Sequence, residues 1–296
     1  MKKILVSLLV IFTITTSADA RCCNHNHHNR CTPACHYHSS SHSSSIYVIR
    51  RDFQQEKSPF ANCKNHSLLT KTTIYHYSDG SKRSYKQYTI LNADGSVFEE
   101  NCSSVKHVIY NKFHYFIIKK NKQYKIMTED GKQISKRNYT AMNEITTNRL
   151  LVKYNKKYGI IDLNDNIIVP IKYNSFELVG TRLFITKLNG YYGIIDSDGK
   201  IYLKNEYDKI KPLYDTYLLK KYNKYGLADF HGLIILEPKY NKIKTLGEYI
   251  LVKKDKNYAI FDSEGRQISD YKYKKIQLKR NILYGTIHKH KKAITQ

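Results

Sequence analysis

An internal repeat of about 33 to 36 residues runs from residue 85 onward, and such a chain buries a core only when its copies pack together. Each copy is anchored on one aromatic residue: Tyr88, Tyr124, Tyr158, Tyr192, Tyr225 and Tyr258. Seven residues later comes a turn position, occupied by Gly95, Gly131, Asp165, Gly199, Gly232 and Gly265. A second tyrosine follows 15 residues after the anchor in the last five copies: Tyr139, Tyr173, Tyr207, Tyr240 and Tyr273. Because several offsets stay in register, we expect one structural unit repeated along the chain.

Turn chemistry within each copy predicts short β-strands. Apolar runs such as residues 249–252 and 258–262 are separated by polar turns, and dipeptides such as Asn189-Gly190 and Asp198-Gly199 tolerate the positive φ of tight hairpins. We therefore expect an all-β array of about six three-stranded β-meanders, each with a crossing segment. The array is either a propeller-like ring or an open β-solenoid. In the ring, a partial last copy at residues 292–294 completes a blade begun by residues 46–49 or 72–77.

Two copies resemble a known family. Residues 157–162 (KYGIID) with 168–173 (IVPIKY), and residues 224–229 (KYGLAD) with 236–240 (LEPKY), are similar to WG repeats, bacterial β-repeats named for a Trp-Gly pair. The resemblance covers about residues 85–280 and is strongest over 150–276. Tyr replaces the family's Trp in every copy, and the glycine follows only at Gly159, Gly193 and Gly226. The resemblance implies an exported or surface β-scaffold without assigned chemistry, and it carries over no catalytic residue.

The repeat positions are interpreted as structural rather than catalytic. This applies to the anchors and turn glycines Tyr124, Tyr158, Tyr192, Tyr225, Tyr258, Gly199, Gly232 and Gly265. It also applies to the aspartates four residues after an anchor, which recur before a turn where Asp bonds its own backbone: Asp162, Asp196, Asp229 and Asp262. The histidines of the body, His288 and His290 among them, are scattered, and no nucleophile, phosphate-loop or metalloprotease motif occurs. We expect no enzyme activity and no cofactor.

The first twenty residues have the pattern of a secretory signal peptide. A basic start (Lys2, Lys3) precedes an apolar stretch at residues 4–16, and Ala18 and Ala20 place small residues before a cleavage site after Ala20. An uncleaved anchor helix is the alternative, which the short apolar run disfavours. We therefore expect a periplasmic or secreted protein with no membrane span after cleavage and no intracellular nucleic acid as partner. Residues 46–84 are then a β lead-in, and 85–296 the repeat domain.

Residues 21–45 form a segment rich in Cys, His and Ser. Thiolates and imidazoles are ligands for zinc, copper or nickel, which makes a candidate metal set of Cys22, Cys23, His25, His27, His28, Cys31, Cys35, His36 and His38. The spacing lacks the paired CxxC pattern of a structural zinc site. In an exported chain, an even set of six cysteines that includes Cys63 and Cys102 favours disulfides instead, or a passive tail.

Lysines recur beside the repeat tyrosines. The chain has 50 Lys plus Arg against 25 Asp plus Glu, a formal charge of +25. Short Lys/Tyr motifs precede each anchor strand, so stacked copies align charge and aromatic faces that could hold an anionic polymer. The candidate binding residues are Lys153, Lys156, Lys157, Lys220, Lys221, Lys224, Lys253 and Lys254. A solvated lysine rim that protects strand edges, or AT-rich coding bias, explains the same residues.

Two functions follow from these patterns. The first is a non-enzymatic exported scaffold that binds a macromolecule, an acidic envelope polymer, a glycan or a protein, through the lysine-rich repeat faces. The alternative is an exported transition-metal-binding protein that uses the N-terminal Cys/His segment.

Overall fold

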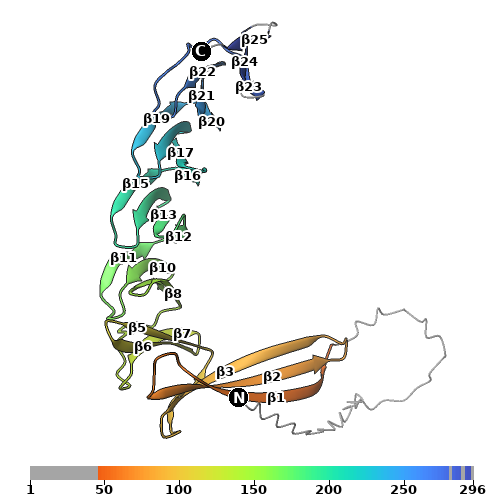
Figure 1. The fold of residues 1–296 in the computed structure, drawn as a ribbon, viewed down its shortest axis with the longest axis vertical. Helices are drawn as coiled ribbons and strands as arrows, with labels where there is room; N and C mark the ends of the chain where they lie inside the picture. Colours follow the sequence, from red (N-terminus) through yellow and green to blue (C-terminus); the bar gives the residue numbers. More distant parts are fainter. Residues whose placement is uncertain (1–45, 280–281, 288–290, 295–296) are drawn as a thin grey trace, which may run out of the picture. The chain divides into compact units, whose positions relative to one another are not determined.

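The computed structural model describes residues 46–279, 282–287 and 291–294, and all regular elements in these ranges are β-strands. They form seven small antiparallel sheets (Figure 1). The prediction of an all-β repeat array is confirmed. The described residues contain no helix of the length and apolarity that a bilayer crossing requires. The predicted signal peptide (1–20), the Cys/His/Ser segment (21–45) with its candidate metal ligands, and His288 and His290 lie outside the described residues.

The chain divides into two compact units between Val105 and Lys106. Tyr88 and Gly95, which the sequence assigns to the first repeat, lie in the first unit. Its sheet A has four strands in sequence order: β1 (Val48–Pro59), β2 (His66–Tyr77), β3 (Lys82–Asn92) and β4 (Val97–Cys102). Strand β5 begins at the boundary between the units.

The second unit carries six sheets, which we call B to G in chain order. Sheet B contains β5 (Ser104–Tyr110), β6 (Phe113–Lys120) and β7 (Gln123–Thr128). Sheet C contains β8 (Ala141–Thr146), β9 (Arg149–Tyr154), β10 (Lys157–Ile161) and β11 (Ile167–Tyr173). Sheet D contains β12 (Ser175–Leu178), β13 (Leu183–Leu188), β14 (Tyr191–Asp196) and β15 (Ile201–Tyr207). Sheet E contains β16 (Lys209–Pro212), β17 (Thr216–Lys221), β18 (Lys224–Asp229) and β19 (Ile234–Tyr240). Sheet F contains β20 (Lys242–Leu246), β21 (Tyr249–Lys254) and β22 (Asn257–Phe261), and sheet G contains β23 (Lys275–Lys279), β24 (Ile282–Thr286) and β25 (Lys291–Ile294).

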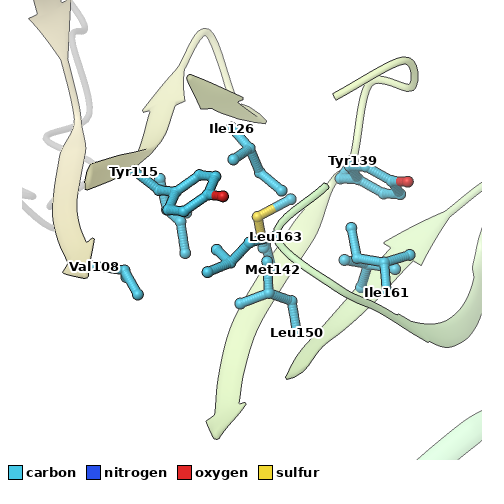
Figure 2. Close-up of a cluster of buried hydrophobic side chains, with 10 residues drawn as sticks. Val108, Tyr115, Ile126, Tyr139, Met142, Leu150, Ile161 and Leu163 are labelled. Atoms are coloured by element: carbon cyan, nitrogen blue, oxygen red, sulfur yellow. The ribbon is translucent and has the colours of Figure 1, made fainter. Parts of the chain in front are cut away.

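Consecutive sheets of the second unit share a hydrophobic core. Strands of each sheet contact strands of the next one, for example β14 with β16 and β18 with β20. Figure 2 shows the core between sheets B and C, where Tyr115 and Ile126 meet Met142 and Leu150. A unit of three or four short strands cannot bury its apolar side alone, so each copy depends on its neighbour for stability.

The predicted closing strand does not complete an early blade. Strand β25 pairs with β24 inside sheet G. Residues 48–49 belong to β1 and residues 72–77 to β2, and these two strands pair with each other in sheet A. The pairing that the ring alternative required for residues 292–294 is therefore not formed. The last partial copy instead supplies the third strand of its own sheet.

In three sheets, a glycine after the anchor tyrosine lets the fourth strand approach closely. A Cβ on Gly159, Gly193 or Gly226 would lie 2.6–2.7 Å from the backbone of the fourth strand, so only glycine permits the close crossing. These glycines lie in sheets C, D and E, which have four full strands; sheet A also has four, with Thr89 after its anchor. Lys125 and Ala259 stand at this position in sheets B and F, where isolated bridges, Tyr124 to Tyr139 and Tyr258 to Tyr273, replace the strand. The predicted crossing segment is thus the fourth strand.

Cys63 is a buried free thiol. The interpretation of all six cysteines as disulfide partners is wrong for this residue. Cys102 is also buried, and its Sγ lies 3.6 Å from the carbonyl oxygen of Glu100. It pairs with Tyr88 across β3 and β4, the place that a second tyrosine takes in the later copies.

Candidate anion-binding face

Two-residue turns at the same place in successive sheets set the geometry of the candidate site. These turns join the second and third strands of sheets C to E and the matching strands β6 and β7 of sheet B. Both turn residues have positive φ: Asn121 and Lys122, Asn155 and Lys156, Asn189 and Gly190, Tyr222 and Asn223. Positive φ at both positions matches the twist of a hairpin. In sheet F the turn begins at Asp255, with φ 53°.

This register places a lysine directly opposite each anchor tyrosine. Lys153 pairs with Tyr158 across β9 and β10, and the same pairing recurs in sheets B, D, E and F. The ammonium nitrogen lies over the tyrosine ring in all five: 5.0 Å from the centroid for Lys119 and Tyr124, 5.0 Å for Lys153 and Tyr158, 4.9 Å for Lys187 and Tyr192, 5.8 Å for Lys220 and Tyr225, and 5.6 Å for Lys253 and Tyr258. Such contacts contribute about 0.5–1 kcal/mol at exposed sites. We call these five pairs the Lys–Tyr row.

The eight predicted binding lysines all lie at this end of the sheets. Lys153, Lys220 and Lys253 belong to the Lys–Tyr row, and Lys156 lies in the turn. Lys157 and Lys224 begin third strands, whereas Lys221 and Lys254 end second strands. Sequence reasoning missed Lys119 and Lys187, although each stands five residues before its anchor, as Lys153 does.

The tyrosines fix the lysines and belong largely to the core. Each anchor from Tyr158 to Tyr258 also pairs with a second tyrosine on its other side, and these second tyrosines are buried. Burial raises the pKa of the Tyr173 and Tyr207 hydroxyls. Because one ring face is covered by lysine and the second rings are buried, the row presents charge rather than free aromatic faces. The stacking part of the sequence hypothesis is not supported by this arrangement.

Some candidate charges are already compensated. Lys221 forms an ion pair with Glu206 at 3.1 Å and also lies over the Tyr207 ring. No ion-pair partner appears among the described residues for Lys153, Lys220 or Lys253. The row therefore contains lysines whose ammonium groups have a ring contact but no counter-charge.

The repeated aspartates serve the turn at the third strand's end. Asp196 Oδ1 accepts the backbone N–H groups of Asp198 and Lys200, both at 2.9 Å. Asp162, Asp229 and Asp262 accept from the residue four positions later in the same way. These carboxylates are therefore engaged with their own backbone.

Asp165 replaces the turn glycine in sheet C and reaches into the preceding copy. Its buried carboxylate accepts a hydrogen bond from the Tyr139 hydroxyl and from the backbone N–H of Lys136 at 2.8 Å, and Arg137 lies 3.8 Å away. Burial is the main cause that raises the pKa of Tyr139, and the hydrogen bond to Asp165 is the second. The segment before Tyr139 forms only isolated bridges instead of a regular fourth strand. The cluster connects sheets B and C.

Comparison with known proteins gives no family. No protein-family description matches the chain, and no curated protein matches it. Solved structures similar to it include the AfRom2 CNH domain, at 11% identity and a TM-score of 0.27, covering 84% of this chain and 97% of that chain. Another is Kluyveromyces lactis Hsv2p, at 13% identity and a TM-score of 0.28, covering 64% of this chain and 70% of that chain.

Proposed function

We propose that the chain is a non-enzymatic, exported repeat scaffold that binds an anionic macromolecule along the Lys–Tyr row. The observation that carries the proposal is the recurrence of one ammonium position in five consecutive sheets, each held over a tyrosine ring. A solvated rim requires no such fixed geometry. Membership of the WG repeats is part of this proposal, as is export.

The spacing of the row favours a polymer over a small anion. Packed sheets lie about 10 Å apart, so one ammonium group follows another at roughly that interval. The Debye length is about 8–10 Å at physiological salt, which is close to the interval between neighbouring ammonium groups. A polymer that lies along the row therefore interacts with several ammonium groups at once. A small anion gains only the attraction of one position.

Salt dependence tests this proposal directly. The full chain is titrated with a sulfated polysaccharide and with a neutral polysaccharide of similar length, each at low and high ionic strength. We expect binding of the sulfated chain alone, weakened strongly by salt because salt screens the attraction between the ammonium and sulfate groups. Binding that does not change with salt, or no binding at low salt, would falsify the electrostatic proposal.

The second function, transition-metal capture by residues 21–45, stays a prediction of the sequence because those side chains lie outside the described residues. Comparing zinc uptake by the reduced full chain with uptake by a chain that begins at Ile46 tests it. Equal uptake by the two removes the segment from the mechanism.

A further inference from the structure

Two sheets carry a second lysine directly opposite the lysine of the Lys–Tyr row. In sheet E, Lys209 on β16 pairs with Lys220 on β17, and in sheet F, Lys242 on β20 pairs with Lys253 on β21. Cross-strand partners share one face of a sheet, with Cβ atoms about 4.5–5.5 Å apart. Like charges in this position repel, so each pair costs stability unless an anion joins them. We call these two pairs the dilysine pairs.

The dilysine pairs have little compensation from the protein itself. Lys209 and Lys242 are exposed, and none of the four lysines has an ion-pair partner in the part of the chain that the structure describes. Asp208 is next to Lys209 in the chain, and its Oδ2 lies 3.4 Å from the backbone N of Asn223. In sheet F the corresponding residue is the neutral Asn241. A counter-charge is therefore missing most clearly at Lys242 and Lys253.

The earlier sheets supply an internal contrast. Ala141 pairs with Lys153 in sheet C, and Ser175 pairs with Lys187 in sheet D, so both sheets have one lysine at the equivalent place. The same fold therefore accepts a small side chain at this position. The second lysine of sheets E and F is not required for the strand pairing.

Two adjacent ammonium groups suit an anion with several terminal oxygens. A tetrahedral phosphate or sulfate group offers separate oxygen acceptors to two donors at once, and lysine binds phosphate as a compact point charge with three donors. Sheets E and F are consecutive and in contact through β18 and β20. Because packed sheets lie about 10 Å apart, one extended chain of such groups reaches both pairs. Its second contact is then intramolecular, which raises the overall affinity.

We propose that the two dilysine pairs, one in sheet E and one in sheet F, form two neighbouring binding positions for one linear polymer of tetrahedral oxyanions. Phosphate groups along one flexible chain occupy Lys209 with Lys220 and Lys242 with Lys253. This proposal rests on the proposed function and makes it more specific. It assigns the highest affinity along the Lys–Tyr row to sheets E and F, and it names the chemistry of the ligand.

The test uses the full chain and inorganic polyphosphate as the probe. The variant Lys209→Ser/Lys242→Ser gives sheets E and F the serine that sheet D already has. Its control, Lys132→Ser/Lys204→Ser, removes the same charge from exposed lysines outside the dilysine pairs. We expect the first variant to bind polyphosphate about tenfold more weakly, a change of about 1.4 kcal/mol, and the control to differ from the parent by less than about threefold.

A gain of binding makes the test independent of any loss of folding. The variant Ala141→Lys/Ser175→Lys places a second lysine opposite Lys153 and opposite Lys187. Four consecutive sheets, C to F, then carry a dilysine pair. We expect about tenfold tighter binding of long polyphosphate, and little change for inorganic triphosphate, which is too short to join several pairs. Circular dichroism of each variant verifies the fold.

The outcomes separate this inference from the proposed function. If both double serine variants lose affinity equally while the parent still binds in a salt-sensitive way, the dilysine site is refuted. The proposal that the Lys–Tyr row binds anionic polymers is then retained. If polyglutamate binds as tightly as polyphosphate and responds to the same variants, the preference for tetrahedral oxyanions is refuted. If the parent binds no anionic polymer at low salt, the proposed function itself has failed.

Discussion

Gly232 offers the sharpest test of the packing between sheets. It lies at the turn before β19 with φ 81°, and a Cβ added there would lie 2.5 Å from the carbonyl oxygen of Tyr202 in the preceding sheet. Gly190 has a similar φ of 92° but nothing within 4 Å of its added Cβ. Both replacements by alanine incur the left-handed penalty of about 1–2 kcal/mol. Only Gly232→Ala must also push two sheets apart, which costs about 1–3 kcal/mol more.

Urea unfolding of the full chain measures this difference. The chain has no Trp and 27 Tyr, so far-UV circular dichroism together with tyrosine fluorescence follows the transition. With a slope of about 1–3 kcal/mol per molar urea, we expect the midpoint of Gly232→Ala to lie about 1 M below that of Gly190→Ala. Equal midpoints for the two variants would refute the claim that the turn glycine is required by contact with the neighbouring sheet.

Three further predictions concern single residues. Asp196→Ala removes the acceptor of two backbone N–H groups and should lower the free energy of unfolding by about 1–3 kcal/mol. Asp196→Asn retains an acceptor and should lower it less. Equal losses of stability in urea unfolding would contradict the role of Asp196 in the turn. Asp165→Gly introduces the residue of most other copies and leaves the buried Tyr139 hydroxyl and the Lys136 N–H without their acceptor. It should cost about 1–3 kcal/mol. An unchanged or raised melting temperature argues against the cluster. Burial raises the pKa of Tyr173 and Tyr217, and burial together with Tyr240 raises the pKa of Tyr271 to about 12. These hydroxyls stabilise the fold fully below the unfolded tyrosine pKa of about 10, and this contribution is lost as the pH rises through their folded values. Tyr173→Phe should therefore reduce the alkaline loss of stability in pH-dependent thermal melts, and an identical loss in both proteins rejects this explanation.

The repeat, the turns and the tyrosine pairs could be predicted because they depend on short, fixed offsets. Asn189-Gly190 marks its hairpin, and Tyr158 and Tyr173 stand 15 residues apart, which brings them together across β10 and β11. Positive φ at Tyr222 could not be predicted, since tyrosine has no preference for this conformation and the hairpin imposes it. The sequence left the pairing of the chain end open because strand pairing over a long separation leaves no local signal.

The candidate site was predicted in its position but not in its pairing. The lysines before each anchor are evident in sequence, whereas Lys209 and Lys242 were missed because their partners depend on the register of the first strand. A signal was present: each stands two residues after a second tyrosine, Tyr207 or Tyr240. The contact of Asp165 with Tyr139 joins two copies 26 residues apart, so it depends on how the copies pack and has no local sequence signal.

Binding by a variant of the Lys–Tyr row tests the central claim most directly. In the test variant Lys153, Lys187, Lys220 and Lys253 become Gln, and in the control Lys132, Lys136, Lys172 and Lys204 become Gln, so that both lose the same charge. At about 0.5–1 kcal/mol for each charge contact that is lost, we expect the row variant to bind a sulfated polysaccharide about 30- to 1,000-fold more weakly than the parent at low salt. The control should retain most of the affinity. Equal weakening of the two variants would contradict a binding face on the row and would assign the attraction to net charge alone.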